Sequence, residues 1–254
     1  MLPFAAGELT LDQAQHRLEI EEDGSGKEPM KFLRRTREHY GERLGSAGLA
    51  ELREQTRAAC QTFFAAAPKL DADAGAAALR ELIAGLVQWT TSRLGGQRWL
   101  IKQPDLCTLL ERTSTLLPAA RFVHVVRAPL DVLSSRVDRG FQPDFDAAFE
   151  VWFARLRRVA EFSRRMPERI THLNLRSLVE DPQAELERLC AFLDLSFDPA
   201  LVAAAARVEG SAAHAGRGER RFTELERRRV LEASAELNAL AGFCLVPAQD
   251  RALR

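Results

Sequence analysis

The chain has 254 residues, of which 46% are hydrophobic and 28% charged, with 36 basic and 36 acidic side chains. A chain of this length and composition can fold without disulfides or a structural metal, and it is not of the disordered class. Because the formal net charge is zero, a general affinity for nucleic acid or for an anionic membrane surface is disfavoured, and any anion-binding site has to be local.

The first 95 residues are predicted to be mostly helical. Apolar side chains recur at intervals of three and four residues in three segments, at about 28–44, 47–66 and 74–94. The break between the first two segments is expected at the glycine-containing stretch Gly45–Gly48, and the polar residues 21–28 are predicted to form a loop.

The following part of the chain alternates between short apolar runs and helical patterns. Three runs are predicted to be strands, at 99–102, 122–126 and 170–175, and each is followed by a helical pattern. This alternation is typical of a parallel sheet with right-handed crossovers, and the second run is apolar enough to be covered on both faces. Long helices are expected over 144–165 and 223–240. We therefore expect a single helix-rich α/β domain over residues 1–254.

No targeting or metal-binding signal is visible in the sequence. No apolar run reaches the length of about 18 residues that a membrane span needs. The segment Met1–Glu8 lacks the charged and apolar regions of a secretory signal. The four cysteines form no Cys-x-x-Cys pair, which favours reduced thiols in a cytoplasmic protein, and the histidines have no metal-ligand spacing. His124 and His172 are predicted to be core residues with satisfied hydrogen bonds.

A candidate anion site follows the second predicted strand. Ligands of open parallel sheets bind at the carboxyl ends of the strands, where the next helix presents unpaired N–H groups. Arg127 ends this strand, and Ser135 lies two turns into the next helix, so both could contact one phosphate. The alternative is that Arg127 only caps the sheet edge and Ser135 packs on its helix. Pro129 and Asp131 suit the first turn of that helix.

Two further basic features lie outside this segment. Lys102 follows the first predicted strand and precedes a helix that begins with proline, although a plain surface lysine is the alternative. The tract His214–Arg221 is basic, and its glycines Gly216 and Gly218 would let backbone N–H groups approach an anion closely. A linker without a ligand is the alternative for this tract.

Three segments together resemble the sulfotransferases that use 3′-phosphoadenosine 5′-phosphosulfate (PAPS). The first is Trp99-Leu-Ile-Lys102-Gln-Pro104, and the second runs from Leu117-Pro-Ala-Ala-Arg121 through the strand to Arg127-Ala-Pro-Leu-Asp131 and Ser135. The third is 175–199, which is similar to a segment of that family with a Glu-Asp pair and a later Phe-Leu. The resemblance covers residues from about 99 to 243.

The resemblance implies a P-loop NTPase-like sulfotransferase fold with PAPS as co-substrate and no metal. Arg127 and Ser135 would hold the 3′-phosphate, and Arg217 with Arg220 would correspond to a late basic loop over the same phosphate. Lys102 would stabilise charge on the bridging oxygen during transfer. Residues 96–243 would form the core with this half-site, and residues 1–95 the acceptor side.

The sequence also departs from the family pattern. Ala128 replaces the usual Asp or Asn, and Gln103 replaces the usual Thr, Asp or Met. The Arg-Ser-Gly-Thr-Thr phosphosulfate loop is absent, and Gly24–Lys27 lacks the features of a Walker loop that could replace it. Gly7-Glu8-Leu9 resembles a segment that follows the loop in the family, which makes Glu8 a candidate general base and predicts that the first strand and helix lie before Met1.

The expected function is sulfuryl transfer from PAPS to a hydroxyl or amine of a small molecule, sugar or peptide. The alternative is a non-catalytic or truncated homologue that binds nucleotide or a partner protein, and a kinase-like nucleotide-binding protein is a third reading. We expect no nucleic-acid or membrane partner, and the sequence leaves a homodimer open.

Overall fold

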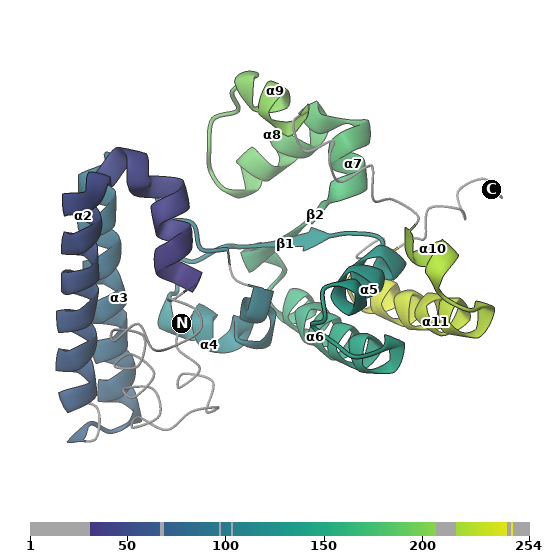
Figure 1. Ribbon diagram of the computed structural model, residues 1–254, viewed down its shortest axis with the longest axis horizontal. Helices are drawn as coiled ribbons and strands as arrows, with labels where there is room; N and C mark the ends of the chain where they lie inside the picture. Colours follow the sequence, from purple (N-terminus) through teal and green to yellow (C-terminus); the bar gives the residue numbers. More distant parts are fainter. Residues whose placement is uncertain are drawn as a thin grey trace. The chain divides into compact units, whose positions relative to one another are not determined.

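The computed structural model describes residues 31–66, 69–96, 98–102, 104–206, 217–242 and 245. The contacts within the chain divide it into two compact units. The colours of Figure 1 follow the residue number along the chain. The first unit is Met1–Pro104 with Arg112–Pro118, and the second is Asp105–Glu111 with Ala119–Arg254. The boundary passes through helix α4 (Leu110–Leu116). The single domain expected over residues 1–254 stays a prediction.

The first unit contains a pair of long helices, α2 (Lys31–Ala66) and α3 (Ala72–Leu94). The predicted break in the first helical region is confirmed, because α2 is kinked at Gly45, whose φ of 65° is a conformation that glycine adopts at little cost. Asp71 caps the start of helix α3, because its side chain accepts a hydrogen bond from the Ala74 N–H at 2.8 Å. An ion pair between Arg93 and Glu51 joins the two helices.

The strand predicted at 99–102 is wrong. Residues 98–102 have no regular secondary structure, and Leu100 is 77% exposed. Trp99 and Ile101 are also exposed, at 38% and 40%. An apolar run specifies a strand only where a neighbouring strand completes the hydrogen-bond ladder, and in the described part of the chain this run has no such ladder.

The second unit is built on two parallel strands, β1 (Phe122–Val126) and β2 (Ile170–Asn174). They pair in the register Phe122↔Ile170, which confirms two predicted strands and their parallel arrangement. The connection runs through α5 (Pro129–Asp138) and α6 (Phe145–Arg165). The fold class is therefore helix-rich α/β. The expected cover on both faces of β1 is incomplete, because Val125 is 52% exposed.

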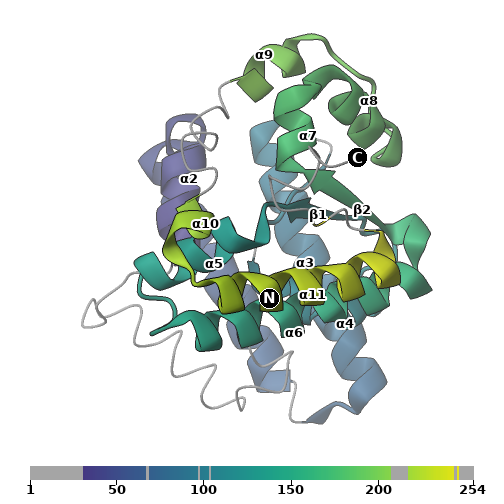
Figure 2. The ribbon, with the colours of Figure 1, turned by 90° about the vertical axis from the view of Figure 1, so that its right-hand side faces the viewer.

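Helices lie on both sides of this strand pair (Figures 1 and 2). Helices α5 and α6 lie on one side with α10 (Arg217–Arg221) and α11 (Glu224–Ala241). The other side is occupied by α7 (Leu175–Glu180), α8 (Pro182–Phe192) and α9 (Ala200–Ala206). The arrangement leaves the end of β1 next to the start of α5, on the side that α10 and α11 also occupy.

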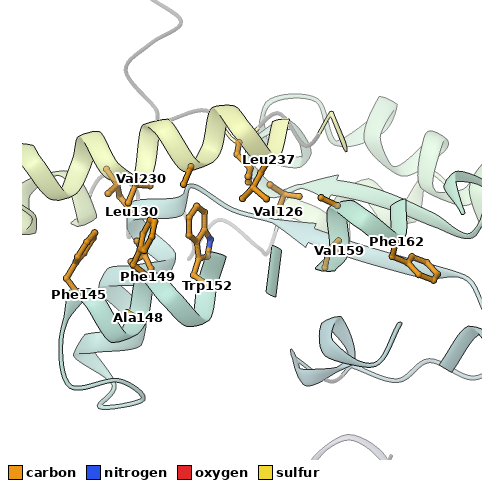
Figure 3. Close-up of a cluster of buried hydrophobic side chains, with 14 of the residues drawn as sticks. Val126, Leu130, Phe145, Ala148, Phe149, Trp152, Val159, Phe162, Val230 and Leu237 are labelled. Carbon is orange, nitrogen blue, oxygen red and sulfur yellow. The ribbon is translucent and has the colours of Figure 1, made fainter. Parts of the chain in front are cut away.

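The core of the second unit lies between α6, α11 and the strands (Figure 3). Asp144 caps α6 by accepting the Ala147 N–H at 2.9 Å, and Thr223 and Glu226 form a capping box at the start of α11. The Phe162 ring is 1% exposed and meets the Phe122 ring edge-on at a centroid distance of 5.3 Å. The other buried members of the cluster in Figure 3 include Val126, Leu130, Phe145, Ala148, Phe149, Trp152, Val159, Val230 and Leu237.

Two histidines face each other across the strand pair; their predicted hydrogen bonds are present, but both residues are half-buried rather than in the core. The Nδ1 atoms of His124 and His172 are 3.1 Å apart, and His172 Nε2 is 3.0 Å from Ser163 Oγ. Burial, followed by the nearby His172, lowers the pKa of His124 from 6.5 to about 4. Burial, followed by the charge of Arg188, lowers the pKa of His172 from 6.5 to about 4. Both imidazoles are therefore neutral at pH 7, and the Nδ1–H of one ring donates a hydrogen bond to the Nδ1 of the other.

We expect the two histidines to make the folded protein less stable in mild acid. The unfolded chain binds protons on both histidines below about pH 6.5, whereas the folded chain does so only near pH 4, so unfolding becomes more favourable as the pH falls between these values. We expect the free energy of unfolding in urea to fall by about 2 kcal/mol between pH 7 and pH 4.5, a figure reduced for the partial exposure of both rings.

The double variant His124→Leu/His172→Leu should lose most of this pH dependence. Ser163→Ala is the matched control, because it removes a hydrogen bond from His172 but keeps both titrating rings. An unchanged pH dependence in the double variant would show that other groups cause it.

Candidate functional site

The candidate site begins where β1 ends and α5 begins. Arg127 directly follows Val126, the last residue of β1, and Pro129 occupies the first turn of α5. Ala128 is the residue before the helix and supplies no side-chain cap to it. The partial positive charge of this helix end is offset by the Asp131 carboxylate in the first turn, not by a side chain at the capping position.

Arg127 differs from many other arginines of the second unit in that no acidic side chain among the described residues pairs with it. Its side chain is half-buried, and it makes no hydrogen bond or ion pair with another residue that the structure describes. By contrast, Arg155 lies 2.6 Å from Asp105, and Arg229 lies 2.6 Å from both Asp146 and Glu150. A half-buried guanidinium without a counter-ion is favourable only if a ligand or solvent satisfies it, and its planar fork matches a phosphate.

Two adjacent serines of α5 have different surroundings. Ser134 is 3% exposed, and its hydroxyl donates to Asp138 Oδ2 at 3.2 Å. Ser135 is half-buried, and its hydroxyl has no hydrogen-bond partner among the described residues. The structure thus leaves Ser135, and not Ser134, available to a ligand.

Helix α10 packs against the first turn of α5. The Gly218 N–H donates to the Asp131 Oδ1 at 3.1 Å, in a buried position. A Cβ atom at position 218 would come closer than 3.0 Å to the backbone carbonyl of Leu130, so only glycine fits there. An ion pair between Arg221 and Asp138 joins the same two helices further along.

This contact corrects one expectation from the sequence. The N–H of Gly218 was expected to face a bound anion, and it is instead satisfied by the carboxylate of Asp131. The tract around it is also not a plain loop, because Arg217–Arg221 forms one helical turn. Gly216 lies outside the described residues.

The remaining predicted residues are placed as follows. Lys102 is exposed and belongs to the first unit, whereas Arg127 and Ser135 belong to the second. Glu8 lies outside the described residues. Arg217 is the first residue of α10, and only its backbone is described, while Arg220 is exposed in the same helix. The structure therefore places Arg127 between β1 and α5, Ser135 within α5, and the turn that contains Gly218 against the first turn of α5.

The sequence did not indicate the contact between Asp131 and Gly218, which are 87 residues apart. Asp131 was expected only to favour the helix end electrostatically. It is 5% exposed, which is uncommon for a carboxylate without a specific partner. The glycines of the basic tract were a signal of close backbone packing, but the sequence does not reveal which residues they pack against.

The described residues contain no cluster of three or more His, Cys, Asp or Glu side chains that could coordinate a metal ion. Cys60, Cys107 and Cys190 are free thiols, and burial raises the pKa of Cys60 and of Cys107. None of the described helices combines the length and the apolar character needed to cross a bilayer.

The chain belongs to the sulfotransferase family, whose sequence profile matches residues 11–199. Among solved structures, the chain is similar to a sulfotransferase domain from the curacin biosynthetic pathway, with 26% identity and a TM-score of 0.39. The match covers 55% of this chain and 56% of that domain, so it spans little more than half of the domain's length. A comparison with curated proteins found no match. Family membership supports a sulfotransferase function in general.

Proposed function

We propose that this protein transfers a sulfuryl group from PAPS to a hydroxyl or amine of a small molecule, sugar or peptide in the cytoplasm. The observation that carries the proposal is the half-buried Arg127, which has no partner among the described residues and lies between the end of β1 and the start of α5. The family of the chain supplies the class of reaction.

The residues near α5 fit the 3′-phosphate of the nucleotide. Arg127 would bind two phosphate oxygens through its guanidinium, and Ser135 would donate one hydrogen bond from its hydroxyl. The arginines at the start of α10 would add positive charge, because that helix packs on the first turn of α5. Phosphate recognition of this kind fixes the position of the nucleotide and takes no part in breaking a bond.

The transfer itself needs a charge near the leaving oxygen and a base at the acceptor. As the acceptor oxygen or nitrogen bonds to sulfur, the bond from sulfur to the 5′-phosphate oxygen breaks, and the acceptor proton passes to a base. Lys102 is proposed to neutralise the leaving oxygen, and Glu8 is proposed as the base.

A second candidate is a relative that binds the nucleotide without transferring the sulfuryl group. It is favoured by the absence of an Arg-Ser-Gly-Thr-Thr motif from residues 1–254. Transfer of radioactive sulfate from PAPS separates the two candidates, because only the enzyme would release adenosine 3′,5′-bisphosphate in step with a labelled product.

The nucleotide site is tested by thermal unfolding with adenosine 3′,5′-bisphosphate. At about 100 times its dissociation constant a ligand stabilises the folded state by about 2.7 kcal/mol, and we expect the Tm to rise by about 5 °C or more. Adenosine 5′-monophosphate, which lacks the 3′-phosphate, is the matched control and should give a much smaller rise. Equal Tm values with both nucleotides, or no rise with either, would contradict the proposal.

A further inference from the structure

The contact between Asp131 and Gly218 joins a buried carboxylate to a position where only glycine fits. Asp131 is a buried carboxylate whose Oδ1 accepts a backbone N–H from a segment 87 residues away. Gly218 is buried against the Leu130 backbone, where no side chain fits. Each feature alone is unusual, and together they fix the spacing between α10 and α5.

The segment fixed in this way is basic. Gly218 is flanked by Arg217, and Arg220 and Arg221 follow in the same helical turn. Arg221 is bound to Asp138 and is thus occupied by α5, whereas Arg220 is exposed and has no partner among the described residues. The first turn of α5, on which Gly218 lies, begins two residues after Arg127.

We infer that Asp131 and Gly218 are positioning residues that hold the basic turn 217–221 against the first turn of α5, close to Arg127, so that Arg220 and Arg127 act on one phosphate. The inference rests on the proposed function, because it concerns the 3′-phosphate of the same nucleotide. Asp131 does not bind the phosphate, since a carboxylate would repel it; the carboxylate acts through the Gly218 N–H, which also offsets part of its charge.

Two substitutions at position 131 isolate this role. Asp131→Ala and Asp131→Asn both remove the negative charge, but only asparagine keeps an oxygen that can accept the Gly218 N–H. The measured quantity is the ratio of the affinities for adenosine 3′,5′-bisphosphate and adenosine 5′-monophosphate, by calorimetry on the full chain. We expect Asp131→Ala to lower this ratio about tenfold and Asp131→Asn to change it by less than about threefold.

Gly218→Ala gives an independent test from the other side of the contact. Its methyl group would overlap the Leu130 carbonyl and displace α10, so we expect a loss in the affinity ratio of about tenfold or more. Gly85→Ala is the matched control, because nothing lies within 4 Å of a Cβ atom at position 85 in α3. It should leave the ratio unchanged.

The affinity ratio separates positioning from general damage to the fold. A variant that merely loosens the fold would weaken the binding of both nucleotides equally and leave the ratio of their affinities constant. That result would overturn the inference. If the unmodified chain prefers the bisphosphate but neither Asp131→Ala nor Gly218→Ala lowers the ratio, the inference fails and the proposed function stands. If the unmodified chain shows no preference, the proposed function itself fails.

Discussion

Replacing Arg127 by alanine should weaken the binding of adenosine 3′,5′-bisphosphate by about 100-fold. The guanidinium is half-buried and uncompensated within the described part of the chain, so its interaction with a doubly charged phosphate is only weakly screened. Loss of a charge-assisted pair of hydrogen bonds corresponds to about 2–3 kcal/mol, which gives a change of this size in the dissociation constant. Calorimetry measures the change directly.

The effect should depend on the 3′-phosphate and on the shape of the side chain. Binding of adenosine 5′-monophosphate should change by less than about threefold in the same variant. Arg127→Lys keeps the charge but loses the planar fork, so its affinity should lie between those of the unmodified chain and Arg127→Ala.

Arg164→Ala is the charge-matched control for this experiment. Arg164 is an exposed residue at the end of α6, which leads towards the start of β2. Since β1 and β2 are parallel, the start of β2 lies at the opposite end of the strand pair from Arg127. If Arg164→Ala weakens the binding of adenosine 3′,5′-bisphosphate as much as Arg127→Ala does, the nucleotide is attracted by positive charge in general and the proposed site is wrong.

Replacing Phe162 by alanine should lower the free energy of unfolding of the second unit by about 3–5 kcal/mol. The ring is 1% exposed and packs edge-on against Phe122 of β1, so its removal leaves a cavity between α6 and the sheet. Urea unfolding monitored by circular dichroism measures the change. A matched exposed phenylalanine is available at position 141, which is 60% exposed.

Phe141→Ala should change the same free energy by less than about 0.5 kcal/mol, as is usual for surface substitutions. Similar losses in the two phenylalanine variants would mean that Phe162 does not lie in a close-packed core. The comparison also tests the position of α6, on whose orientation the parallel crossover from β1 to β2 depends.

The local pattern of the sequence determined most of the elements of the second unit. The apolar run Phe122–Val126 was predicted with its observed bounds and a helix was predicted after it, because a buried strand and a helix started by proline each have a strong local signal. The positions of Arg127 and Ser135 relative to these elements followed from the same pattern. The kink at Gly45 was likewise visible as a break in helical periodicity.

What the sequence could not supply was the identity of partners distant along the chain. Residues 99–102 have the composition of a strand but lack a ladder in the described structure, since strand formation depends on a neighbour that composition does not specify. The same limit applies to the contact between Asp131 and Gly218, and to the difference between Ser134 and Ser135, whose identical side chains differ only in what surrounds them. Local propensity fixes the elements, whereas burial and pairing across the tertiary structure decide which polar groups remain available to a ligand.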